Sequence, residues 1–137
     1  MYYTLIQDFF ENQYDPKKLG DKLFTKKAEY EFYLPYYMII VGERTKRHSV
    51  CIKMYEIIFK YKFIAPQWWM NNLIHNLQFC IPYLPKDPVF LTKLIDYIDT
   101  ALGAGISFSS NHYEILTNIS NHYSYQFIAP CKIVPKT

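Results

Sequence analysis

Between Ser49 and Tyr61, polar residues recur every three or four positions and apolar residues fill the gaps between them. The polar positions are Ser49, Lys53, Glu56 and Lys60. At about 100° per residue, these positions form one stripe roughly 60° wide on an α-helix. A helix with so narrow a polar stripe must be covered by other elements on most of its sides. The pattern therefore predicts a central helix near residues 47–62.

The next segment, residues 63–85, is 23 residues long and contains no Asp, Glu, Lys or Arg. Prolines at its two ends predict a helix over residues 66–81. The expected core face of this helix comprises Trp69, Met70, Leu73, Ile74, Leu77, Cys80 and Ile81. The opposite face carries Gln67, Asn71, Asn72, His75, Asn76 and Gln78. Because each amide would need a partner in hydrocarbon, we exclude a membrane span.

Other segments show similar signals, and the strongest of them is residues 87–103. Apolar residues at helical spacing predict further helices over residues 2–13, 15–27 and 87–103. The next helix is expected to start at Asn111, with Glu114 as its capping-box partner. Residues 29–42 fit either a short helix that begins at Pro35 or a buried extended run.

The fold class that follows is all-α. Short connections make the helices at residues 46–62, 66–81 and 87–103 antiparallel neighbours. We predict a compact bundle of five to seven helices around the central helix. Residues 1–124 would form a single helical domain, and residues 125–137 an extended C-terminal tail.

The polar face of the 66–81 helix also carries two large rings, Trp68 and Phe79. On the helical wheel these rings lie within about 20° of each other and roughly 16 Å apart along the axis. A face with aromatic rings and no charge has the composition of a protein–protein contact. We predict an interface formed by Trp68, Asn72, His75 and Phe79, either with a partner protein or with a second copy. The alternative is that residues 1–42 cover this face within the monomer.

The charge of the chain is uneven. Residues 1–62 hold 11 Lys and Arg with 8 Asp and Glu, whereas residues 63–137 hold 4 of each kind. Basic residues form two clusters: Lys17, Lys18, Lys22, Lys26 and Lys27, and then Arg44, Lys46 and Arg47. Lysines that contact phosphates, with tyrosines that stack on bases, would make the protein nucleic-acid-associated. Interleaved acids weaken this alternative, and a solvated helix face explains the clusters equally well.

Catalytic and metal-binding signatures are weak. His112 and His122 lie ten positions apart, about 15 Å along a helix, so they cannot share a metal ion directly. Asp96 and Asp99 share a helix face and could form a carboxylate pair, but a solvated face is the simpler explanation. Three cysteines without paired spacing do not suggest disulfides. We therefore expect no cofactor, no metal and no enzymatic activity, although a Cys–His pair formed by the fold stays an alternative.

These patterns together predict a non-enzymatic interaction or scaffolding module. The first residues include Asp8 and Glu11 and no positive segment, which is not typical of a signal peptide. With unpaired cysteines, this favours a cytoplasmic or other intracellular location, including that of a host cell. The excess of Lys over Arg and of Ile, Tyr and Phe over Ala and Gly is typical of an AT-rich genome, so a viral origin is part of the hypothesis.

Overall fold

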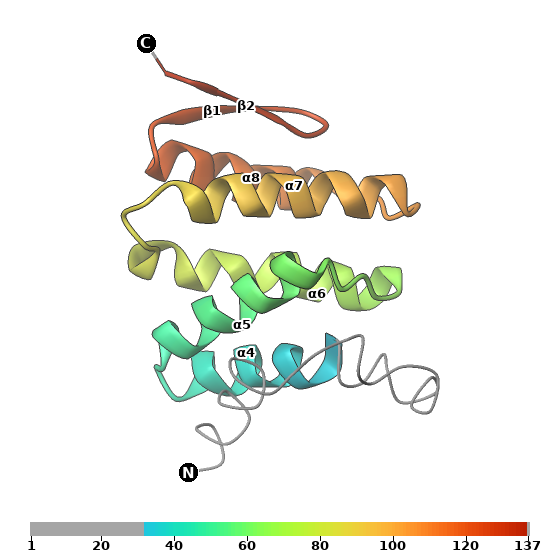
Figure 1. Cartoon of the computed structure of the whole chain (residues 1–137), viewed down its shortest axis with the longest axis vertical. Helices are drawn as coiled ribbons and strands as arrows, with labels where there is room; N and C mark the ends of the chain where they lie inside the picture. The colour runs from blue at the N-terminus through green and yellow to red at the C-terminus, as the bar shows by residue number, and fades with distance from the viewer. Residues whose placement is uncertain (1–31, 137) are drawn as a thin grey trace. The chain divides into compact units, whose positions relative to one another are not determined.

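The computed structural model describes residues 32–136, and this part of the chain is mostly helical (Figure 1). The α-helices are α4 (Leu34–Arg44), α5 (His48–Tyr61), α6 (Gln67–Asn76), α7 (Val89–Gly103) and α8 (Ser110–His122). The other elements are a 3-10 helix, η4 (Leu77–Tyr83), and two strands, β1 (Tyr125–Ile128) and β2 (Lys132–Pro135). The prediction of a helical protein is confirmed, with the addition of a short two-stranded sheet.

The chain divides into two compact units, with the boundary between Phe63 and Ile64. The helices α4 and α5 belong to the first unit, and all later elements belong to the second. The helices expected over residues 2–13 and 15–27 lie outside the described residues. A single domain over residues 1–124, built around one central helix, stays a prediction.

Of the two alternatives for residues 29–42, the described part of this segment shows the helix, α4, in the first unit. Pro35 lies in its first turn, where a missing N–H leaves no helical hydrogen bond unmade. The helix passes through Gly42, which is buried. A Cβ atom at Gly42 would lie only 2.7 Å from Sγ of Cys51 on α5. Gly42 therefore allows a close approach of α4 and α5 at this point.

The helix α5 has the narrow polar stripe that the sequence predicts. Ser49, Lys53 and Lys60 are exposed and Glu56 is half-buried. The apolar positions between them are buried, namely Cys51, Ile52, Met54, Tyr55, Ile57, Ile58 and Phe59. The burial of α5 thus follows its sequence pattern closely.

In the second unit, the helix predicted over residues 66–81 is split into two windings. It is an α-helix to Asn76 and then a 3-10 helix that includes Pro82. Pro82 has no N–H to donate four residues back, and its ring would clash with that carbonyl in an α-helix. Tighter 3-10 winding is common at helix ends. None of the helices within residues 32–136 has both the length and the apolarity of a segment that crosses a bilayer.

The core of the second unit comes from one face of each of its helices. It contains Met70, Leu73, Ile74, Leu77, Cys80, Phe90, Leu91, Leu94, Tyr97, Ile98, Ala101, Ile115, Leu116 and Ile119. Tyr97 is completely buried, and its hydroxyl donates to Sδ of Met70 at 3.3 Å. The helix predicted over residues 87–103 begins at Val89, two residues later than expected. The Asp87 carboxylate accepts the Val89 N–H at 3.0 Å at this start.

The C-terminal segment is extended, as predicted, but its two halves pair as an antiparallel hairpin. Its register places Gln126 opposite Val134 and Phe127 opposite Ile133. The hairpin packs on α8, which lies between it and α6 (Figure 1). The rings of Tyr113 and Phe127 stack with their centroids 5.9 Å apart. These contacts attach the tail to the helices, which its sequence alone does not indicate.

Candidate protein interaction face

The four residues predicted to form an interface lie on α6 and η4, and we call them the α6 face: Trp68, Asn72, His75 and Phe79. The exposed fraction is 63% for Trp68 and 42% for Phe79. His75 is also exposed, and Asn72 is half-buried. An exposed apolar patch with polar neighbours is typical of a binding surface. The alternative in which residues 1–42 cover this face depends largely on residues outside the described part.

The winding of the chain sets how these residues are aligned. Trp68, Asn72 and His75 follow the spacing i, i+4, i+7, which places them along one line of α6. From Leu77 onward each residue turns by about 120° instead of about 100°. Phe79 therefore lies about 60° further around the axis than a continuous α-helix would place it. The predicted alignment of Phe79 with Trp68 is corrected accordingly.

Contacts within the face hold its side chains in place. The rings of His75 and Phe79 meet edge to face with their centroids 6.1 Å apart, so Phe79 stays next to the line despite its rotation. Trp68 meets Trp69 edge to face at 4.7 Å. The Asn72 side-chain amide donates to the Trp68 carbonyl at 2.9 Å. Side chains ordered in this way lose less conformational entropy when a partner binds.

Two other amides of α6, which the sequence analysis placed on the same polar face, bind the protein itself. Oε1 of Gln67 accepts the Ser107 N–H at 2.9 Å, and Nε2 of Gln67 donates to the Ser107 carbonyl at 2.6 Å. The same Nε2 lies 2.6 Å from Oδ1 of Asn71, which accepts from it. The polar residues of α6 thus divide into those that hold the α7–α8 loop and those of the α6 face.

His112 has a structural role that the sequence analysis missed. The N-cap of α8 is Ser109, not Asn111, so the expected capping box with Glu114 is wrong. Ser109 instead forms the box with His112, and its N–H donates to Nδ1 of His112 at 3.1 Å. Histidine replaces the Glu or Gln that usually occupies this position, and the Ser-x-x-His spacing was the available signal.

The other ring nitrogen of His112 reaches α6. Nε2 lies 3.1 Å from the carbonyl oxygen of Asn71, and the side chain is only 9% exposed. Burial lowers the pKa of His112 below its ordinary value, and His75 lowers it further. The hydrogen bond to Asn71 acts in the opposite direction. The ring is therefore a neutral bridge between the start of α8 and α6.

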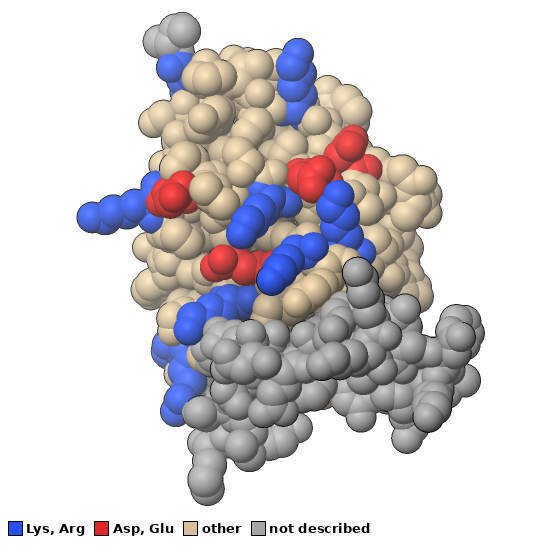
Figure 2. All heavy atoms as spheres, in the orientation of Figure 1, with Lys and Arg blue, Asp and Glu red and all other residues tan. Residues whose placement is uncertain are grey.

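The structure brings together one of the two predicted basic clusters. Arg44, Lys46 and Arg47 are all exposed at the connection between α4 and α5. Figure 2 shows Lys and Arg interspersed with Asp and Glu on the face that it draws. The other members of the predicted patch lie outside the described residues: Lys17, Lys18, Lys22, Lys26 and Lys27. A patch made of all eight residues stays a prediction.

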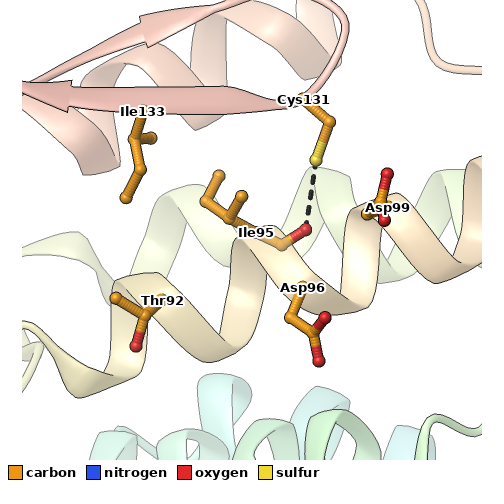
Figure 3. A pocket seen from close by; sticks show the side chains of 6 residues that line it. All are labelled: Thr92, Ile95, Asp96, Asp99, Cys131 and Ile133. Carbon is orange, nitrogen blue, oxygen red and sulfur yellow. Dashed lines mark hydrogen bonds between the residues drawn. The ribbon is translucent and has the colours of Figure 1, made fainter.

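A shallow groove of about 390 Å³ runs between α7 and the hairpin (Figure 3). It is lined by Thr92, Ile95, Asp96, Asp99, Cys131 and Ile133. Asp96 and Asp99 point to different sides of α7 rather than toward one another. The Cys131 thiol donates to the Ile95 carbonyl at 3.1 Å. Burial, together with Asp99 and Asp96, raises the pKa of Cys131 to about 11, so the thiol stays protonated.

Metal-binding geometry is absent from the part of the chain that the structure describes. No group of three or more His, Cys, Asp or Glu side chains between residues 32 and 136 could hold a metal ion. Comparison of the chain with models of protein families, with curated protein sequences and with solved structures finds no match.

Proposed function

We propose that this protein is a non-enzymatic interaction module that binds a partner protein, or a second copy of itself, through the α6 face. The observation that carries the proposal is the exposure of Trp68 and Phe79, 63% and 42%, in a segment of 23 residues without Asp, Glu, Lys or Arg. Tryptophan is among the residues that contribute most to binding free energy in protein contacts. A face without ions also avoids the desolvation of charges on binding.

The arrangement of the face supports recognition by a groove on the partner. Side chains at i, i+4 and i+7 present one side of a helix, which is how helices dock into grooves. Trp68 at one end and Phe79 at the other supply apolar anchors. Asn72 and His75 lie between them and can donate or accept hydrogen bonds that select the orientation of the partner.

The chemistry of the cysteines supports a non-enzymatic role. Cys51 and Cys80 are buried, and the raised pKa of Cys131 keeps its thiol protonated near neutral pH. The thiolate is the nucleophilic form of cysteine, so a protonated thiol is a poor nucleophile.

The test combines two substitutions in the face with one matched control outside it. Trp68→Ala removes the largest anchor, and Asn72→Lys places a charge in the middle of the face. Tyr37→Ala removes an exposed ring from α4, where Tyr37 is 52% exposed. Circular dichroism first verifies that each variant folds.

Sedimentation velocity and affinity capture from the native cell then compare the variants with the wild type. Self-association, or the capture of a defined partner, should be lost in Trp68→Ala and Asn72→Lys and kept in Tyr37→Ala. A monomeric protein whose captured partners survive both α6 substitutions would refute the proposal. Binding to nucleic acid that weakens steeply with salt, and that depends on Arg44, Lys46 and Arg47, would favour the alternative function instead.

A further inference from the structure

The α7–α8 loop, residues 104–109, is attached to α6 by two side chains. Gln67 forms a pair of hydrogen bonds with the backbone of Ser107. His112 forms the second attachment, because its ring lies between the Ser109 N–H and the Asn71 carbonyl. This second attachment contains a group that titrates near neutral pH.

The hydrogen bonds of His112 determine its tautomer. The Ser109 N–H can only donate, so Nδ1 must be unprotonated to accept it at 3.1 Å. The Asn71 carbonyl can only accept, so Nε2 must carry the proton that it receives at 3.1 Å. Only the neutral ring with its proton on Nε2 satisfies both neighbours.

Protonation of the ring would place a second proton on Nδ1, facing the N–H of Ser109. The Ser109 hydroxyl also lies 3.1 Å from Nδ1 and could accept this proton. The Ser109 N–H would still lose its acceptor, and two N–H groups would face each other. Leaving this part-buried donor without an acceptor is unfavourable.

None of the groups that shift the pKa of His112 is a carboxylate. The elements in the most extensive contact with α8 are α6, η4 and β1. Their titratable side chains, with those of α8, are His75, Cys80, Tyr83, Tyr125, Tyr113, Glu114 and His122. Glu114 is the one carboxylate among them, and two residues after His112 it points away from it on the helix. His112 also lies in the first turn of α8, where the helix dipole disfavours a cation.

We propose that His112 is a pH-sensitive latch, which in its neutral form holds the α7–α8 loop and the first turn of α8 on α6 and releases them when protonated. Since burial lowers the pKa of His112, the fold favours the neutral ring. The latch is fully closed above the ordinary histidine pKa of about 6.5 and opens as the pH falls below that value.

NMR spectroscopy of the ¹⁵N-labelled full chain tests the latch between about pH 8 and pH 5. Ring ¹⁵N signals should show the Nε2–H tautomer of His112 at high pH. The hydrogen exchange of the Ser107 and Ser109 amides, normalised to intrinsic exchange at each pH, should accelerate as the ring becomes protonated. His112→Gln keeps a capping-box acceptor that cannot titrate, so its normalised exchange should stay constant. The control His122→Gln removes an exposed histidine at the other end of α8 and should behave as the wild type.

Three results would overturn the proposal. The first is an Nδ1–H tautomer of His112 at high pH. The second is normalised exchange of Ser107 and Ser109 in the wild type that does not change between about pH 8 and pH 5. The third is an acceleration in His112→Gln equal to that of the wild type. The first two need no variant, so the test holds even if His112→Gln does not fold.

Discussion

Replacing Gly42 by alanine should destabilise the protein, although alanine is favoured over glycine in a helix by about 1 kcal/mol. The new Cβ would lie 2.7 Å from Sγ of Cys51 and 3.2 Å from the Arg47 carbonyl oxygen. Apolar atoms normally stay about 3.5 Å or more apart. Neither neighbour withdraws easily, because one is backbone and the other is a buried thiol that donates to the Ile39 carbonyl at 3.2 Å.

The magnitude follows from these two opposing effects. Overpacking a well-packed interior costs about 1–3 kcal/mol, and a contact short by almost 1 Å belongs at the upper end of that range. After the gain in helix propensity is subtracted, the free energy of unfolding should fall by about 2 kcal/mol. Urea unfolding followed by far-UV circular dichroism measures this difference.

A double-mutant cycle with Cys51→Ala identifies the cause. Without the sulfur atom, Gly42→Ala should change stability little, which gives a coupling free energy of about 2 kcal/mol. Gly103→Ala is the matched control, since a Cβ at Gly103 on α7 meets nothing within 4 Å. Gly42→Ala that stabilises the protein by about 1 kcal/mol would refute the close approach of α4 and α5. An equal loss with and without the Cys51 sulfur would refute it too.

Three further predictions concern the second unit. Cys131 should react with iodoacetamide about a hundredfold more slowly than a small free thiol near neutral pH, because its pKa is raised from 9.0 to about 11. Peptide mass spectrometry measures the rate of alkylation, and a rate equal to that of the free thiol would contradict the prediction. Ser109→Ala should lower the free energy of unfolding by about 1 kcal/mol through loss of the N-cap, and an unchanged urea midpoint would argue against the cap. Tyr97→Phe should lower the free energy of unfolding by no more than about 1 kcal/mol, because the thioether sulfur of Met70 is a weak hydrogen-bond acceptor. A much larger decrease in urea unfolding would contradict this.

The sequence predicts best those helices in which the same side is exposed, and the same sides are buried, along the whole length. In α5, the regular return of Ser49, Lys53 and Lys60 to one side leaves only apolar residues for the other sides, and burial follows directly. A helix that begins at Pro35 was one of the two alternatives for residues 29–42, and it is the one that α4 shows. Each of these inferences needs only local geometry, because the period of a helix fixes which residues share a face.

The features that the sequence did not predict depend on contacts between distant residues. Strands of four residues are too short to show a clear alternation, and the hairpin is held by Tyr113 and by the carbonyl of Ile95. The N-cap at Ser109 was missed because histidine is not the usual third residue of a capping box.

The four residues of the candidate face stay a prediction, but the winding that the sequence analysis assumed for them was wrong in one detail. A helical wheel could not show that Gln67 and Asn71 bind within the protein while Asn72 and His75 remain on the face. It also assumed one winding throughout, whereas the 3-10 segment from Leu77 rotates Phe79. Whether a polar side chain of α6 remains available on the surface depends on the groups that it contacts. Gln67 contacts Ser107, which lies 40 residues later in the chain, and a periodic pattern does not show such a contact.

Trp68 and Trp69 are the two tryptophans of the whole chain, and they stand side by side on one helix. Fluorescence excited at the red edge of the protein spectrum therefore comes from this single location. Trp68, largely exposed to water, emits at long wavelength, and anything that covers it will shift the emission to the blue. The unlabelled protein thus carries a natural optical reporter at the place where a binding event would have to be seen.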